Sequence, residues 1–506
     1  MLRAFLLLAA ATVWADPRCG SCHHSIVDSY GRTGKARSIA KPRGEVQAQR
    51  QWFHDFSGRR MGVVWQKSKM THWMETKGAV EPYEIEWAIG SGKEAKNYIV
   101  QIGDALFQSP IAWFANRLIW DMAPGYVIDA NPTFYRPLQA DCLQCHAGRA
   151  APIAGTQNRY ADPAIPEPAI GCDRCHGDPA IHLSQPKKDN IVNPAKLPAE
   201  KRDAVCDSCH LAGESRVANP GKRFEDYRPG MAMEDVFSIY VARKNADDTI
   251  LKSQSHAEEL AASRCAIVSK EKLWCGTCHD SHREPAEKVK LNWYRDKCVE
   301  CHKGEPNEMH RRKAGADCVG CHMPKQRPFD GSHASRTDHW IRTTKNEQKF
   351  LERGEQLRAW REPAENLRNR NLALAYLNNS ERTRSLRRLR EGLRVLNDAV
   401  KEGHNDGAVS LAAGLQYVRQ QKPELALPWL QRAVDDQPAD SLRRLQLAAA
   451  LANAGKTEEA KREAMQAIKI EPLLEQAYSL LGQIEPARAG YWKDQYRKAA
   501  PKRLLP

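Results

Sequence analysis

The sequence predicts a mainly α protein, in which a loop-rich domain with one small antiparallel β hairpin is followed by an α-helical solenoid. The first observation is the pattern Cys-x-x-Cys-His, found once at Cys19–His23 and six times between Cys142 and His322. That second stretch is rich in Pro and Gly and has little helical or strand periodicity. The other observation is a change after about residue 345, where cysteine disappears and Ala, Leu, Glu, Arg and Lys recur at helical spacing. The 506 residues leave room for two or three domains.

Each Cys-x-x-Cys-His motif is the attachment sequence of a c-type haem. Two thiols three positions apart can form thioether bonds to the two vinyl groups of one porphyrin, and the adjacent imidazole then binds one axial face of the iron. The motif cysteines are Cys19, Cys22, Cys142, Cys145, Cys172, Cys175, Cys206, Cys209, Cys275, Cys278, Cys298, Cys301, Cys318 and Cys321. The motif histidines are His23, His146, His176, His210, His279, His302 and His322. We therefore expect seven covalently attached haem c groups.

Other readings of the cysteines are weaker. A single Cys-x-x-Cys would also suit a zinc site or a redox dithiol, but seven copies each followed directly by His favour haem. The motifs use fourteen of the fifteen cysteines, which argues against a disulfide framework. Only Cys265 is left over, and we interpret it as a buried structural thiol, with a haem ligand or a reactive thiol as alternatives.

The second axial positions need further ligands, because an iron in a porphyrin has two of them. Seventeen histidines are present, and His404 is interpreted as a surface residue of the helical region. The remaining candidates are His24, His54, His72, His182, His256, His282, His310, His333 and His339. Methionine more often fills gaps in a core, but Met61, Met70, Met74 and Met323 are alternative ligands.

Ligation by two histidines bears on activity. It leaves the iron no open position, so such a haem moves electrons and binds no substrate at the metal. All seven proximal residues are His, which favours an electron carrier over an enzyme. The alternative is a multihaem reductase of nitrogen or sulfur oxyanions that uses one five-coordinate haem. A third reading is an assembly protein in which the helical repeats matter most.

The N-terminus indicates export. Residues 1–15 carry one positive charge, a short apolar run and Val13-x-Ala15 before Asp16, as in a cleavable Sec-type signal peptide. The run is shorter than the roughly 20 residues of a membrane span, and no later stretch is long enough. Cys19 lies too far beyond the run to be a lipidated cysteine. We therefore expect a periplasmic or secreted protein, which agrees with the compartment where bacteria attach c-type haem.

The positive charge does not indicate nucleic-acid binding. The formal net charge is +15, with a pI near 9.1, which alone would suggest such a partner. An oxidised haem with both propionates ionised contributes about −1, so seven haems lower the total to roughly +8. Many Lys and Arg residues are then expected to pair with propionates. Export also separates the protein from the genome, so no nucleic-acid partner is predicted.

Residues 16–140 are predicted to hold one haem and the β hairpin. Glu84–Ile89 alternates between polar and apolar residues, and the runs 97–102 and 105–107 flank the pair Gly103-Asp104. Such a pair suits a two-residue hairpin turn.

Residues 141–345 are predicted to form an array of six haems. The motif starts lie 30, 34, 69, 23 and 20 residues apart, so neighbouring porphyrins are expected to lie close together. The 69-residue interval contains His256 and a helix predicted around Glu234–Ala246.

Residues 346–506 are predicted to form tetratricopeptide repeats. Ala426, Ala433 and Pro438 recur 34 residues later as Ala460, Ala467 and Pro472, which is the spacing of this repeat. Repeats are expected at 407–440 and 441–474, with a third beginning near 475 and a degenerate copy at 366–404; generic helical hairpins are the alternative. Stacked helix pairs make concave binding surfaces, so we expect redox partner proteins to dock here. Oligomers, or molecules stacked into longer conductors, are also compatible with the sequence.

With these landmarks, the chain resembles a family of bacterial multihaem cytochromes c with C-terminal tetratricopeptide repeats, near the tetrahaem cytochromes of ammonia oxidisers. The matching stretches are Thr33–Ser38, Ile89–Gly92, Ala123–Tyr126, Ile191–Pro194, Arg228–Gly230, Cys318–Lys325 and Thr337–Ile341. The resemblance implies a haem-packed electron carrier and no particular substrate. The distal ligands that it implies are His54, His182, His256, His282, His310, His333 and His339. Lys35 departs from the family, which often has Met at that position.

Overall fold

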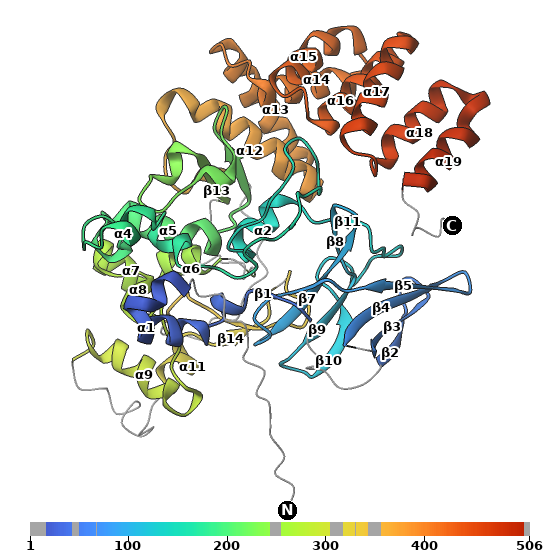
Figure 1. Cartoon of the computed structure of the whole chain (residues 1–506). Helices are drawn as coiled ribbons and strands as arrows, with labels where there is room; N and C mark the ends of the chain where they lie inside the picture. Colours follow the sequence, from blue (N-terminus) through green and yellow to red (C-terminus); the bar gives the residue numbers. More distant parts are fainter. Residues whose placement is uncertain are drawn as a thin grey trace, which may run out of the picture.

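The structure is a computed structural model that describes residues 17–42, 50–66, 68–242, 253, 255–303, 317–328, 330–342 and 356–499. The predicted signal peptide and the candidate ligand His310 lie outside these residues. Along the described chain, helix α1 (Pro17–Gly31) with the first motif comes first, a β-rich part follows, then short helices and loops with the other motifs, and paired helices end the chain (Figure 1). None of the described helices combines the length and the apolar character that crossing a bilayer requires.

The N-terminal part contains far more β structure than the one small hairpin predicted. The hairpin itself is present, because β7 and β8 pair antiparallel with Ile102 opposite Ala105 around Gly103-Asp104. It belongs to a seven-stranded sheet, and a separate four-stranded antiparallel sheet has the order β2-β3-β4-β5. The strands are β1 Ile39–Ala40, β2 Arg50–His54, β3 Arg59–Gln66, β4 Lys69–Thr76, β5 Ala79–Glu84, β6 Trp87–Ile89, β7 Ala95–Ile102, β8 Ala105–Gln108, β9 Ile111–Phe114, β10 Ile119–Met122 and β11 Arg136–Pro137.

Strand β4 shows why the sequence concealed these strands. Met70, His72 and Met74 alternate on its buried face, as a strand with one face in the core requires. Methionine and histidine are weak markers of that pattern, whereas Val and Ile are strong ones. The inward residues pack with the aromatic side chains of Tyr98 and Trp120 in the core of the β region.

The middle part consists mostly of short helices that present the motifs. These helices are α1 Pro17–Gly31, α2 Ala140–His146, α3 Asp173–His176, α4 Ala180–Ser184, α5 Ala199–His210, α6 His256–Ala262, α7 Arg264–Ser269, α8 Cys275–Cys278, α9 Glu287–Val299 and α11 Cys318–His322. Where a motif lies in a helical turn, its two cysteines at positions i and i+3 come to one face. The sequence thus positions both attachment thiols locally, before any long-range contact forms.

The helix predicted around Glu234–Ala246 is wrong. Phe237–Ala242 forms strand β13, which pairs with β12 (Ser215–Ala218) on one side and with β16 (Leu357–Ala359) on the other. All six residues of β13 are buried, so the strand shows no alternation of apolar and polar residues. Its partner β16 lies far along the chain, and a local pattern cannot show that pairing.

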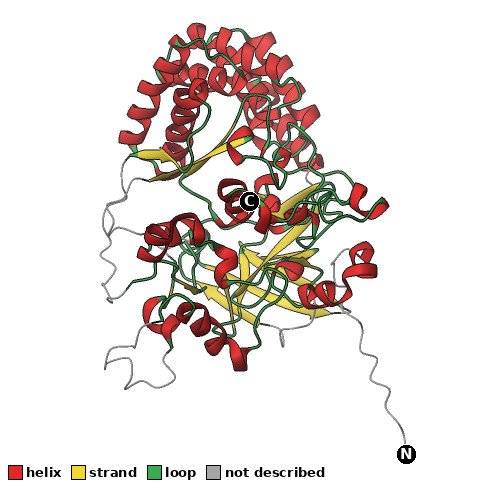
Figure 2. Ribbon diagram, turned by 90° about the vertical axis from the view of Figure 1, so that its left-hand side faces the viewer, coloured by secondary structure: helices red, strands yellow, loops and turns green. Residues whose placement is uncertain are grey.

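The C-terminal part consists of paired helices that form an arch above the rest of the molecule (Figure 2). The helices are α12 Arg368–Thr383, α13 Leu386–Lys401, α14 Gly407–Arg419, α15 Pro423–Asp436, α16 Ser441–Asn453, α17 Thr457–Ile470, α18 Glu475–Ile484 and α19 Ala489–Ala499. Small residues lie where paired helices meet: Ala426 and Ala460 are fully buried, and a Cβ on Gly414 would lie 2.7 Å from Leu430. Residues 407–440 and 441–474 each contain one helix pair, as the 34-residue repeat predicts.

A buried polar cluster fixes the first repeat helix to the haem-bearing part. The guanidinium of Arg370 on α12 donates to both carboxylate oxygens of Asp406, at 2.9 and 2.8 Å, and to the carbonyl of Ala218 at 2.8 Å. Asn371 donates to Asn219 at 3.0 Å and to Ser238 at 3.1 Å. Because these groups are buried, loss of one partner would leave another unsatisfied.

A second contact lies further along the arch. The loop between the second and third motifs reaches the turns of two successive repeats. The Ser441 N–H donates to the carbonyl of Gly155 at 2.9 Å, and the Gln157 N–H donates to the carboxylate of Glu471 at 3.1 Å. Glu214 adds contacts to Asn379 and Arg382 of α12, so the repeats are joined to the haem-bearing part at several places and part of their surface is used within the chain.

Candidate haem-binding site

We number the seven motifs 1 to 7 in chain order. Motifs 1 to 5 border one cavity of 1880 Å³. Its lining includes all five motif histidines from His23 to His279. Three of the candidate distal ligands also line it: His182, His256 and His282. The structure therefore gathers residues from widely separated parts of the sequence around one space.

Four motif histidines face a second histidine from another segment. The ring centroids are 6.4 Å apart for His23 and His182, 5.9 Å for His176 and His282, 6.1 Å for His279 and His339, and 5.5 Å for His210 and His256. A metal bound to two opposed imidazole nitrogens, each about 2 Å away, places the ring centres about 6 Å apart. The three nearly parallel pairs match this spacing, whereas His210 and His256 are closer, with their ring planes at 87°. His256 and His339 also touch, but at 4.8 Å their rings are too close for a metal between them.

Several imidazoles are oriented through Nδ1. The Nδ1 atoms of His176 and His339 lie 2.8 Å from the carbonyl of Val192 and 3.0 Å from that of Thr337. In His182, Nδ1 lies 2.9 Å from the side-chain oxygen of Asn190. Each contact suits a donating Nδ1–H, which leaves Nε2 as the metal-binding nitrogen, as is usual for metal-ligating histidines.

The protonation state of the facing histidines also suits metal binding. Burial, followed by nearby positive groups, lowers the pKa of His210 and of His279 to about 4 and that of His256 to about 2. His210 is exposed and borders the cavity. At neutral pH these imidazoles carry no charge, and the neutral form is the one that binds a metal.

Cysteines of different motifs lie next to one another. Three thiol pairs are within hydrogen-bonding reach: Cys145 with Cys209, Cys206 with Cys275, and Cys298 with Cys318. Each pair joins two different motifs, which are expected to bind separate porphyrins. All of these cysteines are free thiols in the structure.

Apolar side chains beside the motifs complete the fit to haem. Ile181 and Leu183 flank His182 and are exposed, and Ile267 and Val268 are exposed on α7. A porphyrin lying against such groups removes apolar surface from water, which is favourable. Opposed imidazoles, paired thiols and exposed aliphatic groups therefore all fit haem c.

Two predicted ligands are not brought to a motif. His54 on β2 has Nδ1 2.8 Å from the Ser57 hydroxyl and Nε2 3.0 Å from the Val127 carbonyl. The ring nitrogens of His333 lie 2.6 Å from the Asp121 carboxylate and 3.2 Å from Arg117. Protein groups occupy both nitrogens of each ring, so the structure presents neither residue as a ligand. The sequence showed the histidines but not these competing partners.

The other candidate ligands of the β region are core residues. His72 is fully buried, 2.8 Å from the hydroxyl of Ser109, and burial lowers its pKa to about 3. Met61, Met70 and Met74 are buried in the same core. His24 is exposed on α1, and the structure gives it no haem-facing contact.

Cys265 is half-buried on α7, near Cys301 of motif 6, and burial raises the pKa of its thiol. This placement favours a structural thiol. It lies among the attachment cysteines rather than in a site of its own.

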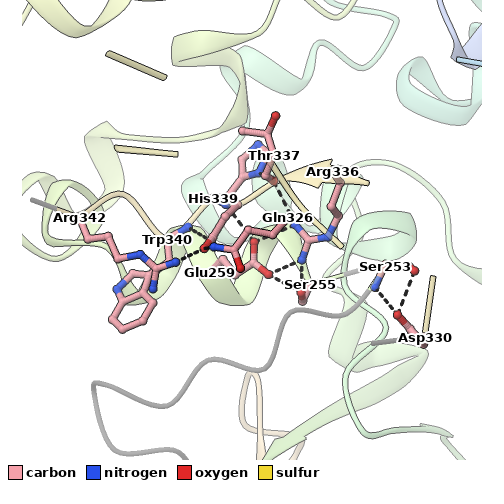
Figure 3. Close-up of polar contacts among 11 residues, drawn as sticks. Ser253, Ser255, Glu259, Gln326, Asp330, Arg336, Thr337, His339, Trp340 and Arg342 are labelled. Atoms are coloured by element: carbon pink, nitrogen blue, oxygen red, sulfur yellow. Dashed lines mark hydrogen bonds and ion pairs between the residues drawn. The ribbon is translucent and has the colours of Figure 1, made fainter. Parts of the chain in front are cut away.

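A network that sequence reasoning missed surrounds His339. Glu259 forms an ion pair with Arg336 there and accepts a hydrogen bond from the His339 N–H (Figure 3). Asp338 accepts hydrogen bonds from the Trp340 N–H and from Gln326. Arg336–Ile341 contains little that a local pattern would single out except His339. Only the fold brings Glu259 to this segment.

Comparison with known proteins gives a short match to a family model described as "Cytochrome c554 and c-prime", over residues 129–177. This segment contains motifs 2 and 3 and supports a c-type cytochrome with covalently bound haem that takes part in electron transfer. No curated protein matches the chain. Solved structures with local similarity include the TPR protein YrrB, described as having an unusual peptide-binding site. It is 22% identical, with 27% of this chain and 70% of that chain covered and a TM-score of 0.24. MamA from Desulfovibrio magneticus RS-1 is 18% identical, with 27% and 75% covered and a TM-score of 0.23.

Proposed function

We propose that this chain is an exported heptahaem c-type cytochrome that transfers electrons along closely packed haems, most of them ligated by two histidines. The observation that carries the proposal is the set of four opposed imidazole pairs, each joining a motif histidine to a histidine from another segment. When bound, each haem would supply an iron that gains and loses one electron. The protein's own residues would hold both axial positions, which would exclude substrate from those irons.

The thiol contacts support an order of neighbouring haems. They place motif 2 beside motif 4, motif 4 beside motif 5, and motif 6 beside motif 7. The electrostatic influence of Cys209 on Cys175 supports motif 3 beside motif 4, and that of Cys278 on Cys298 supports motif 5 beside motif 6. The Tyr30 hydroxyl of α1 donates to the carbonyl of Ile170, just before motif 3, at 2.8 Å, which supports motif 1 beside motif 3. The proposed path runs 1-3-4-5-6-7, with motif 2 as a branch at motif 4.

The test is a spectroscopic count on the purified holoprotein. Intact mass and a haem stain after denaturation should give seven haems per chain, and electron paramagnetic resonance of the ferric protein should show mainly low-spin signals. Fewer than seven attached haems, or mainly high-spin signals, would contradict the proposal.

A second candidate function is reduction of a nitrogen or sulfur oxyanion at one open iron. It is favoured by His146, which borders the cavity and has no opposed imidazole within ring-contact distance among the residues that the structure describes. Titration with cyanide or nitrite would reveal an open iron, and assays with nitrite, hydroxylamine and tetrathionate would reveal turnover. Absence of both binding and turnover would exclude this candidate.

The proposal includes a periplasmic or secreted location and a redox partner that docks on the repeats. Stacked helix pairs provide extended surfaces for such docking. N-terminal sequencing of the exported protein should begin at Asp16 if the signal peptide is cleaved as predicted. Cross-linking in the periplasm, followed by mass spectrometry, should place a partner on repeat helices; cross-links confined to the β region would contradict this part of the proposal.

A further inference from the structure

A buried ion pair joins the two segments that carry His256 and His339 (Figure 3). Glu259 lies on α6 and is 1% exposed, and Arg336 lies on the short strand β15 (Arg336–Thr337). One guanidinium nitrogen of Arg336 donates to Glu259 Oε2 at 2.8 Å, and a second donates to Oε1. A buried carboxylate is costly unless it is paired and hydrogen-bonded in this way, so the pair holds a defined geometry.

The same carboxylate also accepts a backbone N–H at His339 and a side-chain hydroxyl beside His256. Glu259 Oε2 accepts a hydrogen bond from the His339 N–H at 2.9 Å. Glu259 Oε1 accepts one from the hydroxyl of Ser255 at 2.5 Å, and Ser255 immediately precedes His256, the first residue of α6. Arg336 completes the triangle, because it also donates to the Ser255 hydroxyl. Glu259 therefore contacts the chain directly beside His256 and at His339 itself.

These two histidines belong to different opposed pairs. His339 faces His279 of motif 5 at 6.1 Å, and His256 faces His210 of motif 4 at 5.5 Å. Their own rings touch at 4.8 Å. A shift of α6 against β15 would therefore change both pairs together.

We propose that Glu259 is a positioning residue that sets the orientations of His256 and His339 together, so that one carboxylate holds the distal ligands of two neighbouring haems. The inference rests on the proposed function, because it takes these histidines as axial ligands. Arg336 acts with Glu259: it neutralises the carboxylate and fixes its two oxygens in one plane, which a bidentate guanidinium does and a lysine does not. The fold thereby ties two ligands that lie more than eighty residues apart to one rigid point.

The main test is Glu259→Gln in the full-length holoprotein. Glutamine preserves the size of the side chain but cannot accept at both ends from Arg336, Ser255 and the His339 N–H. We expect high-spin ferric signals equivalent to as many as two haems to appear in electron paramagnetic resonance, with the remaining low-spin signals unchanged. Added imidazole should restore the low-spin form, because it fills a vacated axial position.

Two further variants keep the test decisive if Glu259→Gln folds poorly. Ser255→Ala removes the hydroxyl that Glu259 and Arg336 share beside His256 but keeps the bond from the His339 N–H to Glu259, so the change should be limited to one haem signal. Asp406→Asn is the matched control: it also alters a half-buried carboxylate whose two oxygens both accept from one guanidinium, that of Arg370, but in the repeat region. It should lower stability and leave the haem signals unchanged.

The outcomes separate this inference from the proposed function. Haem signals of Glu259→Gln and Ser255→Ala identical to those of the parent protein would overturn the positioning role, and so would an equal change at all haems. If the parent protein itself lacked low-spin signals from two-histidine haems, the proposed function would fail instead.

Discussion

The imidazoles of His23 and His182 have nearly parallel planes, 13° apart, with 6.4 Å between centroids, although they come from the first motif and from helix α4. Nothing in the local sequence of either residue indicates the other. The spacing leaves room for one metal between two nitrogens. The pair thus joins an attachment motif to the candidate second ligand proposed for its haem.

Replacement of His182 by alanine should open one haem. The iron of motif 1 loses its distal imidazole, so one haem should become high-spin in the ferric state and should bind carbon monoxide in the ferrous state. Optical titration with carbon monoxide counts the open sites. His404→Ala serves as the control, since His404 lies between repeat helices and should leave the spectrum unchanged. A His182→Ala protein that binds no carbon monoxide would show that this pairing is wrong.

Replacement of His54 by alanine should leave every haem signal unchanged. The resemblance implies His54 as a ligand, but the structure gives its two ring nitrogens to Ser57 and Val127. Loss of these bonds should instead destabilise the β region by about 1–3 kcal/mol. Near-ultraviolet circular dichroism during denaturation would follow the β region, and electron paramagnetic resonance would follow the haems. A new high-spin signal would restore His54 as a ligand.

The ion pair of Arg370 and Asp406 should make the joint between the two parts sensitive to acid. Burial raises the pKa of Asp406, but the hydrogen bond and the charge of Arg370 outweigh it, so the pKa lies below its ordinary value of 3.8. A depressed carboxyl pKa contributes stability above the unfolded value, and this contribution is lost as the pH falls through the folded value.

The matching variant is Asp406→Asn, which leaves a buried guanidinium without its charge partner. We expect it to lower the free energy of unfolding of the repeat region by about 3 kcal/mol at pH 7. The difference from the parent protein should shrink as the pH falls below about 3.8, because the parent carboxyl is then protonated as well. Urea denaturation followed by far-ultraviolet circular dichroism across this pH range would measure this difference in the free energy of unfolding. A difference independent of pH would contradict the assigned role of the pair.

Gly155→Ala should loosen the second contact between the repeats and the haem-bearing part. Gly155 has φ +77°, and a Cβ there would lie 1.9 Å from the carbonyl oxygen of Ala439, so the loop has to move. The Ser441 N–H would then lose its acceptor, the Gly155 carbonyl. We expect faster hydrogen exchange at Ser441.

The matched control is Gly221→Ala, with φ +69° but no atom within 4 Å of the added Cβ. Both substitutions carry the backbone cost of about 1–2 kcal/mol for a left-handed residue. Only Gly155→Ala adds a steric clash with the repeats. Equal exchange rates at Ser441 in the two variants would show that the loop contact does not hold the repeats.

The long-range pairing of β13 shows what a sequence of this kind conceals. Phe237–Ala242 lies between β12 and β16, and its buried residues give no alternating pattern. The hairpin at Gly103-Asp104 was visible because its turn residues are adjacent in sequence. Strand β4 was not visible in the sequence, because its buried face is marked by Met70, His72 and Met74, and Met and His are weak markers of a strand.

The sequence by itself determined the features whose causes lie within a few residues or in a fixed period. A thiol, a second thiol three positions on and an adjacent imidazole define a haem attachment without the rest of the fold. A 34-residue recurrence of small residues likewise defines paired helices. Only the tertiary structure decided which histidines meet. It placed His182 opposite His23, turned His54 and His333 toward protein groups, and brought Glu259 to His339. An axial ligand is defined by what lies across a few ångströms of space, and the folded backbone sets that distance regardless of separation along the chain.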